Sequence, residues 1–318
     1  MEEQFVVQLK FHGNVDSMNT LMRYIYDNMC STLPVAKVYP THLRVLNSFR
    51  VHFTQFIPGV AGNKLYYNLP LPARIEIVKQ IARAFGTIWD LEIDRTAGMI
   101  GEALVSENPL AISVGPERVD ELGGPFSSVT KYLEVWIHHC IRKLEKAHCI
   151  EEFQEDVLPS IRQMVKKGLN IPFQVEEVPI VISHEDMSLD NMIFSLHEPH
   201  SLQAIIDWEQ VGCMPFATSV PTYIEPLFWN DSKGKQNEHN GHQALRDSFW
   251  DEIPEWKTHV NSEATRIFLD WYRFGHDIYV SPPINYKPTS EQKREIWKDN
   301  TRAALDFLKR YTDESSDI

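Results

Sequence analysis

The octapeptide HEDMSLDN, residues 184–191, contains a histidine, three carboxylates and an asparagine in one short polar run. It follows the apolar segment VPIVIS (178–183) and precedes a second apolar segment, LQAIID (202–207). Short runs of β-branched and aliphatic residues predict two strands, and we expect these two to form one short hairpin. Because loops held by rigid strands commonly carry catalytic groups, the polar run is the first candidate for a functional site.

The spacing of polar residues in this region suggests phosphoryl-transfer chemistry. His184, Asp186 and Asn191 form the pattern H-x-D-x-x-x-x-N, and Asp207 ends the second apolar segment. Phosphoryl transfer needs a carboxylate near the acceptor hydroxyl and oxygen ligands for a metal that bridges the nucleotide phosphates. Asp186 can accept the hydroxyl proton, whereas Asn191 and Asp207 offer the hard oxygen donors that suit Mg²⁺. His184 belongs with Asp186 to the catalytic loop and is expected to brace it by hydrogen bonds.

Length and composition are those of an ordinary globular protein. The chain has 318 residues, 43% of them apolar, which is enough for one large domain or two lobes. The formal net charge of −13 argues against a nucleic acid or an anionic membrane as the main partner, because both attract basic surfaces. The four cysteines are widely spaced, and the sequence has no secretion signal and no apolar run long enough to span a membrane. We therefore expect free thiols and a cytoplasmic protein.

The N-terminal part of the chain has more strand character than the rest. Residues 5–11 have strand composition, and residues 16–29 repeat apolar side chains at helical spacing. Residues 42–59 suggest a hairpin that turns near residues 47–48. Residues 1–58 are thus predicted to form a small lobe with the order strand, helix, strand, strand.

Amphipathic helices dominate the remainder of the chain. The segment LPARIEIVKQIARAFGTIWDLEI (71–93) places its apolar residues on one helical face, and similar patterns recur to the C-terminal end. The only strand character beyond the first lobe lies beside the polar loop. The prediction is an α+β fold of two lobes, with a large, mainly helical lobe over residues 59–318 that contains the hairpin.

At this point the sequence resembles a known family. The segment SHEDMSLDNMIF (183–194) is similar to the H-G-D-x-x-x-x-N catalytic loop of the aminoglycoside phosphotransferase and choline kinase branch of the protein-kinase-like superfamily, particularly its fungal members. The segment AIIDWEQVGCMP (204–215) resembles that family's metal-binding I-D-W-E segment, which occupies the place of the protein-kinase D-F-G. Further landmarks follow in order over most of residues 5–215. The combination of both motifs in this order is more specific than either alone.

The resemblance implies an activity and its cofactors. Family members transfer the γ-phosphate of ATP to a hydroxyl group of a small-molecule acceptor, with Mg²⁺ bound at the site. It also implies that the segment TQFI (54–57) is the hinge between the lobes, so that Gln55, Phe56 and Ile57 would bind the adenine ring. The acceptor is not identified by any motif, and no protein partner is indicated.

The first twenty residues depart from the family pattern. The chain begins at the strand that contains Phe5, without the Gly-rich phosphate-covering loop that the family places before it, so we expect a shortened N-terminal lobe. The family's phosphate-binding basic residue aligns with Gln8, and Lys10, two residues on and hence on the same strand face, is the candidate substitute. Its usual helix partner, a glutamate, falls near Met18, with Asp16 the nearest carboxylate.

Other interpretations stay open. A nucleotide-binding or scaffold pseudoenzyme with weak or no activity would account for the missing phosphate-binding groups. A hydrolase that uses two carboxylates explains neither the asparagine nor the hinge-like segment. Glu185, which replaces the family's glycine, and Asp190 are interpreted as incidental, and Glu209 as structural or as an aid to a second metal.

Overall fold

The computed structural model describes most of the chain as two compact units. The described residues are 4–10, 15–40, 50–92, 94–95, 99–107, 110–118, 120–147, 151–197, 199–229, 241–279 and 290–314. The first unit combines residues 1–127 and 179–261, and the second combines residues 128–178 and 262–318. All candidate site residues belong to the first unit. The predicted lobe boundary after residue 58 lies within that unit and stays a prediction.

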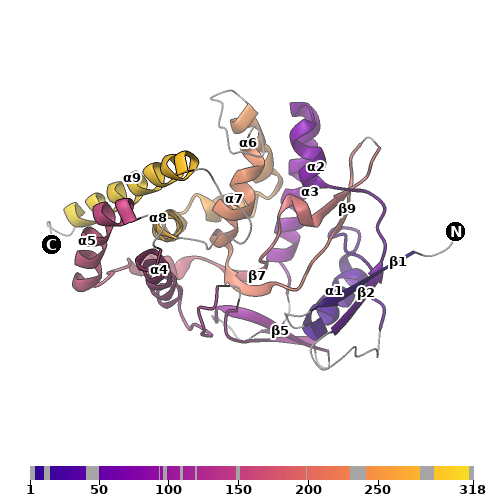
Figure 1. Cartoon of the computed structure of the whole chain (residues 1–318). Coiled ribbons are helices and arrows are strands. Elements are labelled where there is room, and N and C mark those ends of the chain that lie inside the picture. Colours follow the sequence, from indigo (N-terminus) through magenta and orange to yellow (C-terminus); the bar gives the residue numbers. More distant parts are fainter. Residues whose placement is uncertain are drawn as a thin grey trace. The chain divides into compact units, whose positions relative to one another are not determined.

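Three small sheets are present in the described part of the first unit (Figure 1). The first pairs β1 (Phe5–Lys10) with β2 (Arg50–Gln55) in antiparallel register. The second has the strand order β4-β6-β5-β10-β7, and its strands are β4 (Asp94–Arg95), β5 (Gly101–Glu107), β6 (Leu110–Val114), β7 (Ile180–His184) and β10 (Val211–Pro215). The third has the order β3-β8-β9, with β3 (Val60–Ala61), β8 (Met192–Phe194) and β9 (Leu202–Ile205).

Strand β1 alternates between two environments, as a period-2 strand should. Phe5, Val7 and Leu9 are exposed, whereas Gln8 and Lys10 lie on the opposite, half-buried face. This alternation aims the ammonium of Lys10 into the unit. The predicted strand and helix at the start of the chain are confirmed within the described residues, but the turn of the predicted hairpin falls on residues 41–49, which lie outside them.

The helices of the first unit pack on these sheets. Helix α1 packs against β5, where the Ser17 hydroxyl accepts the Val105 N–H at 3.0 Å, and α3 packs against α6 and β7. The α-helices are α1 (Val15–Met29), α2 (Gly62–Leu65), α3 (Leu71–Trp89), α6 (Gly241–Glu252) and α7 (Pro254–Val260). Short turns of 3-10 or π helix are η1 (Tyr66–Asn68), η4 (Leu189–Asn191), η5 (Phe216–Thr218), η6 (Val220–Ile224) and η7 (Glu225–Phe228).

The second unit contains helices and connecting loops, without strands, in its described residues. Its helices are α4 (Val129–Glu145), α5 (Glu151–Lys167), η3 (Phe173–Glu177), α8 (Glu263–Ile278) and α9 (Ser290–Glu314). Helix α8 packs on α4, and α9 packs on α5 and α8. Ser128 caps α4 by accepting the Lys131 N–H at 3.1 Å. The predicted helices of the C-terminal part are confirmed here. In the described residues of both units, no helix is long and apolar enough to cross a membrane.

The predicted hairpin of the two strands beside the polar loop is wrong. Strand β7 pairs with β10, and β9 pairs with β8, so the two predicted strands belong to different sheets. The prediction also contained too few strands, since β3, β4, β5, β6, β8 and β10 were not expected. Their patterns explain this. Strand β10 is buried at every position and contains a glycine and a proline, so it shows no alternation, and β8 has only three residues.

Candidate active site

The polar loop between β7 and β8 is held closed by its own hydrogen bonds. The Asn191 amide nitrogen donates to the backbone oxygen of Asp186 at 2.9 Å and to its carboxylate Oδ2 at 2.8 Å. The Asp186 N–H donates to Nδ1 of His184 at 3.2 Å. The turn η4 completes the loop, with the Asn191 N–H donating to the Ser188 carbonyl at 3.0 Å. The loop therefore fixes the Asp186 carboxylate instead of leaving it on a free surface turn.

His184 is a buried brace between two segments. Its Nε2–H donates to the Ile206 carbonyl at 3.0 Å, and its Nδ1 accepts the Asp186 N–H. Burial lowers the pKa of His184 to about 4, so the ring is neutral at physiological pH. The edge of the ring meets Trp208, with centroids 4.8 Å apart. Because both ring nitrogens are engaged with the backbone, neither is available for proton transfer.

The segment after β9 is tied to the loop a second time. The Ile206 N–H donates to the Asn191 carbonyl at 2.9 Å, so the residue before Asp207 is bonded both to Asn191 and to His184. Asp207 has a φ of +64°, in the left-handed region that aspartate and asparagine tolerate better than most side chains. These contacts bring Asp186, Asn191 and Asp207 into one site from two separate segments.

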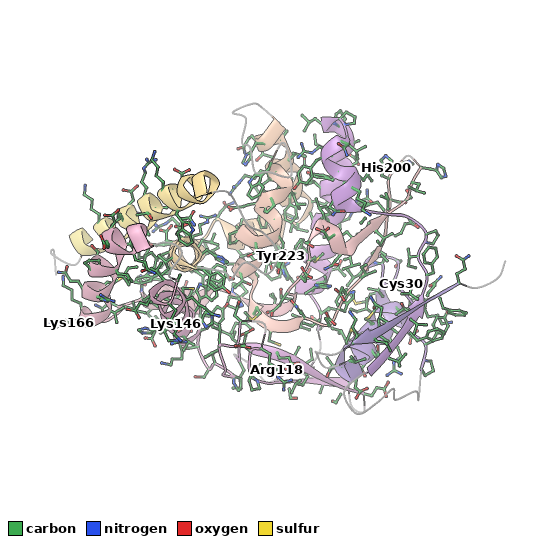
Figure 2. The ribbon with its side chains drawn as sticks, viewed as in Figure 1. Cys30, Arg118, Lys146, Lys166, His200 and Tyr223 are labelled. Carbon is green, nitrogen blue, oxygen red and sulfur yellow. The ribbon has the colours of Figure 1, made fainter. Side chains whose placement is uncertain are left out.

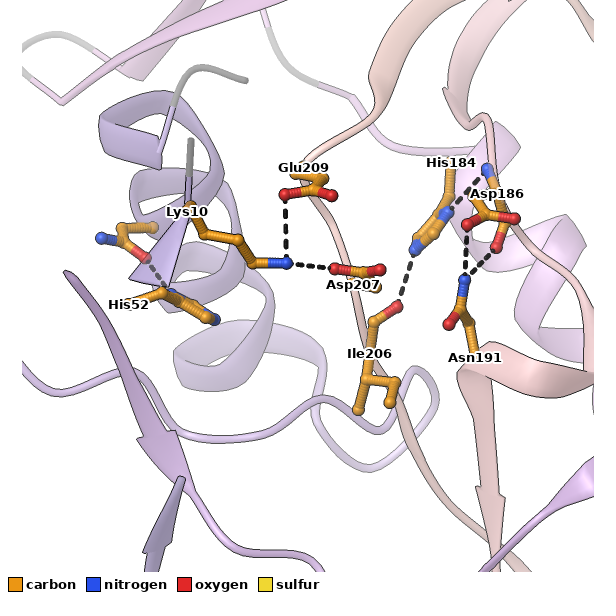
Figure 3. A network of polar contacts seen from close by, with 9 residues as sticks. Lys10, His52, His184, Asp186, Asn191, Ile206, Asp207 and Glu209 are labelled. Carbon is orange, nitrogen blue, oxygen red and sulfur yellow. Dashed lines mark hydrogen bonds and ion pairs between the residues drawn. The ribbon is translucent and has the colours of Figure 1, made fainter. Parts of the chain in front are cut away.

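Lys10 completes the site from β1 (Figure 3). Its Nζ lies 2.5 Å from Oδ1 of Asp207 and 3.0 Å from Oε2 of Glu209. Burial by itself would lower the pKa of Lys10, but the hydrogen bonds and charges of Asp207 and Glu209 outweigh it and raise this pKa. Gln8, which aligns with the family's phosphate-binding basic residue, lies opposite His52 in the β1–β2 register. Of Gln8 and Lys10, it is Lys10 that reaches the carboxylates of Asp207 and Glu209.

His52 is a neighbour of the site that the sequence did not indicate. It lies on β2, its Nδ1 is 2.8 Å from Oδ1 of Asn19, and the acceptor there assigns the proton to Nδ1. Burial and the nearby charge of Lys10 lower the pKa of His52 to about 4. His52 is therefore a neutral imidazole on this side of the site. It adds no positive charge beside Asp207 and Glu209, the carboxylates that pair with Lys10. The sequence did not predict this role for His52, because it is one of thirteen histidines and belongs to no motif.

The donor set fits a hard divalent cation such as Mg²⁺. The Asn191 amide uses its nitrogen for Asp186, which leaves its Oδ1 for another partner, and Asp207 adds an anionic oxygen. The described residues contain no group of three or more carboxylate, imidazole or thiol side chains that could enclose a metal. Mg²⁺ commonly takes only one or two protein oxygens and keeps water and phosphate oxygens as its other ligands. The two protein oxygens at this site, from Asn191 and Asp207, match that number of ligands.

The Asp186 carboxyl has the electrostatics of a base. Burial, together with the charges of Asp207, Asp190 and Glu209, raises its pKa, and the hydrogen bond from Asn191 opposes this rise. A carboxylate with a raised pKa accepts a proton more readily than an ordinary one.

The expected hinge residues begin at the last residue of β2, Gln55, and some of their backbone N–H groups already have hydrogen-bond acceptors. The Gln55 N–H donates to the Lys37 carbonyl at 2.9 Å, and the Phe56 N–H donates to the Gln4 carbonyl at 2.9 Å. Among the described residues, no backbone acceptor is bonded to the Ile57 N–H. The Phe56 side chain is 42% exposed. A planar ligand at this segment would therefore meet the Ile57 N–H and the Phe56 ring.

Glu185 differs from its interpretation as an incidental loop residue. Its Oε1 atom is buried without a hydrogen-bond partner, and it lies against Gly212, where an added Cβ would come within 2.5 Å of it. Burial, and then the charges of Glu117, Asp120 and Glu102, raise the pKa of Glu185 to about 8. Tyr223, labelled in Figure 2, donates its hydroxyl to the Glu185 carbonyl. The sequence could not show this burial, because it is made by residues distant in the chain. Asp190, by contrast, is exposed and accepts a hydrogen bond from Asn63.

Replacing Glu185 by glutamine should flatten the dependence of thermal stability on pH. The folded-state pKa of about 8 lies above the usual glutamate value of 4.5, so the folded protein keeps a proton that the unfolded chain releases. The contribution of Glu185 to stability is therefore present at low pH and lost as the pH rises through about 8. Glutamine mimics the protonated form, so the melting temperature of Glu185→Gln relative to the wild type should rise by a few degrees between mildly acidic and mildly basic buffer. The exposed Glu92→Gln serves as the control. Equal pH profiles for Glu185→Gln and the wild type would contradict the assignment.

Comparisons with known proteins agree on one family and one fold. A sequence model of the phosphotransferase enzyme family matches residues 2–219. No curated protein sequence gives a match. Among solved structures, an apo thermostable mutant of aminoglycoside phosphotransferase APH(4)-Ia superposes with a TM-score of 0.51 at 13% identity, covering 96% of this chain and 87% of that one. A thermostable mutant of the same enzyme in ternary complex with AMP-PNP and hygromycin B gives a TM-score of 0.50 at 13% identity, covering 96% and 86%. These similarities show the mixed α+β, protein-kinase-like fold that the sequence predicted.

Proposed function

This chain belongs to the phosphotransferase enzyme family, and from that premise we propose that it transfers the γ-phosphate of ATP to a hydroxyl group of a small-molecule acceptor, with Mg²⁺ as the metal. The solved APH(4)-Ia complex contains AMP-PNP and hygromycin B. We extend only the chemical class to this chain: a nucleotide donor and a hydroxyl-bearing acceptor. The antibiotic itself is not part of the proposal.

The observation that carries the proposal is the convergence of four side chains from three segments. Lys10 comes from β1, Asp186 and Asn191 from the loop after β7, and Asp207 from the turn that follows β9. The His184 and Ile206 hydrogen bonds fix the two later segments to one another, and the Lys10 ion pair adds the first. A set of solvated surface charges would have no reason to be linked in this way.

The proposed reaction assigns a role to each of these groups. The acceptor oxygen forms a bond to the γ-phosphorus as the bond from that phosphorus to the β-phosphate oxygen breaks, and ADP leaves. Asp186 orients the acceptor hydroxyl and takes its proton. Lys10 provides positive charge for the phosphates, and Ile57 and Phe56 contact the adenine ring. His184 keeps the loop and the Asp207 segment in register.

Asn191 and Asp207 are the residues that would hold the metal. When bound, Mg²⁺ would neutralise phosphate charge as it develops. In the same proposal, residues 1–58 form the smaller lobe and residues 59–318 the larger one, with the hinge at Gln55–Ile57. We also place the protein in the cytoplasm.

The proposal is tested by a phosphotransfer assay on the full chain. ATP and Mg²⁺ are incubated with a panel of sugars, amino sugars and amino alcohols, and ADP and phosphorylated product are measured beside an EDTA blank. We expect metal-dependent ADP formation that at least one acceptor stimulates. We also expect the melting temperature to rise with nucleotide and Mg²⁺, since saturation at 100 times Kd stabilises a protein by about 2.7 kcal/mol. Stabilisation without turnover would favour the pseudoenzyme alternative, and the absence of both would refute nucleotide chemistry here.

A further inference from the structure

One turn holds the Lys10 ammonium with two carboxylates. Asp207 and Glu209 lie 2.5 Å and 3.0 Å from Nζ, and the Lys10 side chain is only 11% exposed (Figure 3). In the described part of the chain, no other lysine or arginine forms an ion pair with either carboxylate. A single ammonium with two anionic partners can lose one of them and remain in place.

The turn is built so that both carboxylates face the same way. Between them lies Trp208, which is 1% exposed and donates its indole N–H to the Ile205 carbonyl at 2.9 Å. Its ring packs against His184. Because the indole is fixed in the interior, the residues on either side of it, Asp207 and Glu209, both project toward Lys10.

Helix α1 offers Lys10 no carboxylate of its own. Its two acidic residues, Asp16 and Asp27, are exposed, and neither contacts Lys10. The α1 residues Ser17, Met18 and Leu21 line a small cavity together with Glu209. Glu209 is therefore the anionic partner of Lys10 that is not also needed by the proposed metal site.

We propose that Glu209 is a positioning residue, which keeps Lys10 directed at the nucleotide phosphates when Asp207 is engaged by the metal. This inference rests on the proposed function and deepens it. In the metal-free protein the two carboxylates share Lys10. In the loaded protein Asp207 is shared with a divalent cation, and the weakened ion pair leaves Glu209 as the anchor.

A double-mutant cycle tests whether Glu209 acts through Lys10. The variants are Lys10→Met, Glu209→Gln, the double variant and Glu209→Asp, with Glu92→Gln as an exposed control. We expect Lys10→Met to weaken binding of a non-hydrolysable ATP analogue on the order of tenfold, the effect of about one charged contact. Glu209→Gln should weaken it by roughly threefold to tenfold, but by less than about twofold in the Lys10→Met background. Glu209→Asp should restore part of the loss, because the charge is kept on a shorter side chain.

Metal dependence supplies a second readout that a merely structural role would not change. The dissociation constant of the ATP analogue is measured by calorimetry with Mg²⁺ and in EDTA. We expect Glu209→Gln to weaken binding more with Mg²⁺ than in EDTA, since without metal Asp207 still holds Lys10. The half-saturating Mg²⁺ concentration should match that of the wild type. Melting temperatures of all variants establish that each is folded.

Several results would overturn the inference. If Glu209→Gln weakened binding of the ATP analogue equally with Mg²⁺ and in EDTA, Glu209 would have a structural role only. A different outcome is that Glu209→Gln weakens binding of the ATP analogue as much in the Lys10→Met background as in the wild type, and raises the half-saturating Mg²⁺ concentration. Those two results together would make Glu209 a metal ligand instead. If the wild type binds nucleotide and turns it over while Glu209→Gln is indistinguishable from it, only the positioning role fails. A wild type that binds no nucleotide would overturn the proposed function together with this inference.

Discussion

Asp186→Asn should lower the phosphotransfer kcat by about 10²- to 10⁴-fold, the range that a positioned proton acceptor contributes. Asparagine has nearly the same shape, and its side-chain oxygen can still accept the hydrogen bond that Asn191 donates to Asp186. The loop should therefore keep its geometry while the group that takes the hydroxyl proton is lost. The measurement is steady-state kinetics with a reactive acceptor, together with the melting temperature of the variant.

Asp190→Asn is the matched control for this experiment. It makes the same chemical change in the same loop, at an exposed carboxylate that accepts a hydrogen bond from Asn63. We expect its kcat to stay within about twofold of the wild type, as surface substitutions usually do. If Asp186→Asn retained a comparable rate, Asp186 would not be the proton acceptor.

Asp207→Asn should reduce metal-dependent turnover on the order of 10²- to 10³-fold, the effect of removing one well-placed electrostatic contact. Asparagine is a better choice than alanine because the backbone at this position has a φ of +64°, which asparagine tolerates and alanine does not. The substitution removes the anionic oxygen without adding backbone strain. It also removes the 2.5 Å ion pair with Lys10, so part of the loss is expected in nucleotide binding.

Titration with Mg²⁺ separates these two contributions. If Asp207 is a metal ligand, the half-saturating Mg²⁺ concentration rises in Asp207→Asn, and nucleotide with Mg²⁺ no longer raises the melting temperature as it does in the wild type. Lys10→Met should affect nucleotide binding without this shift in metal requirement. An unchanged Mg²⁺ dependence in Asp207→Asn would remove Asp207 from the metal site.

Much of the fold followed from local patterns. The long amphipathic helices α3, α4, α5 and α8 were predictable because a 3.6-residue repeat over several turns has few alternative explanations. The five-stranded sheet was not, because β10 is buried on both faces and so lacks the period-2 pattern by which a strand is recognised. Strand partners are a property of the whole chain, which is why β7 and β9 could each be expected as strands and still be paired wrongly.

The sequence by itself determined the chemical types and their order: H-x-D-x-x-x-x-N, then a second aspartate at the end of an apolar strand. This was possible because one loop and one turn hold all of these groups within residues 184–207. Only the tertiary structure decided that Lys10, 197 residues from Asp207, is the cation of the site, and that Glu209 shares it. It also decided that one carboxylate oxygen of Glu185 is buried, near the charges of other carboxylates. Contacts and burial between segments distant in the chain depend on how sheets and helices pack, and no local pattern encodes them.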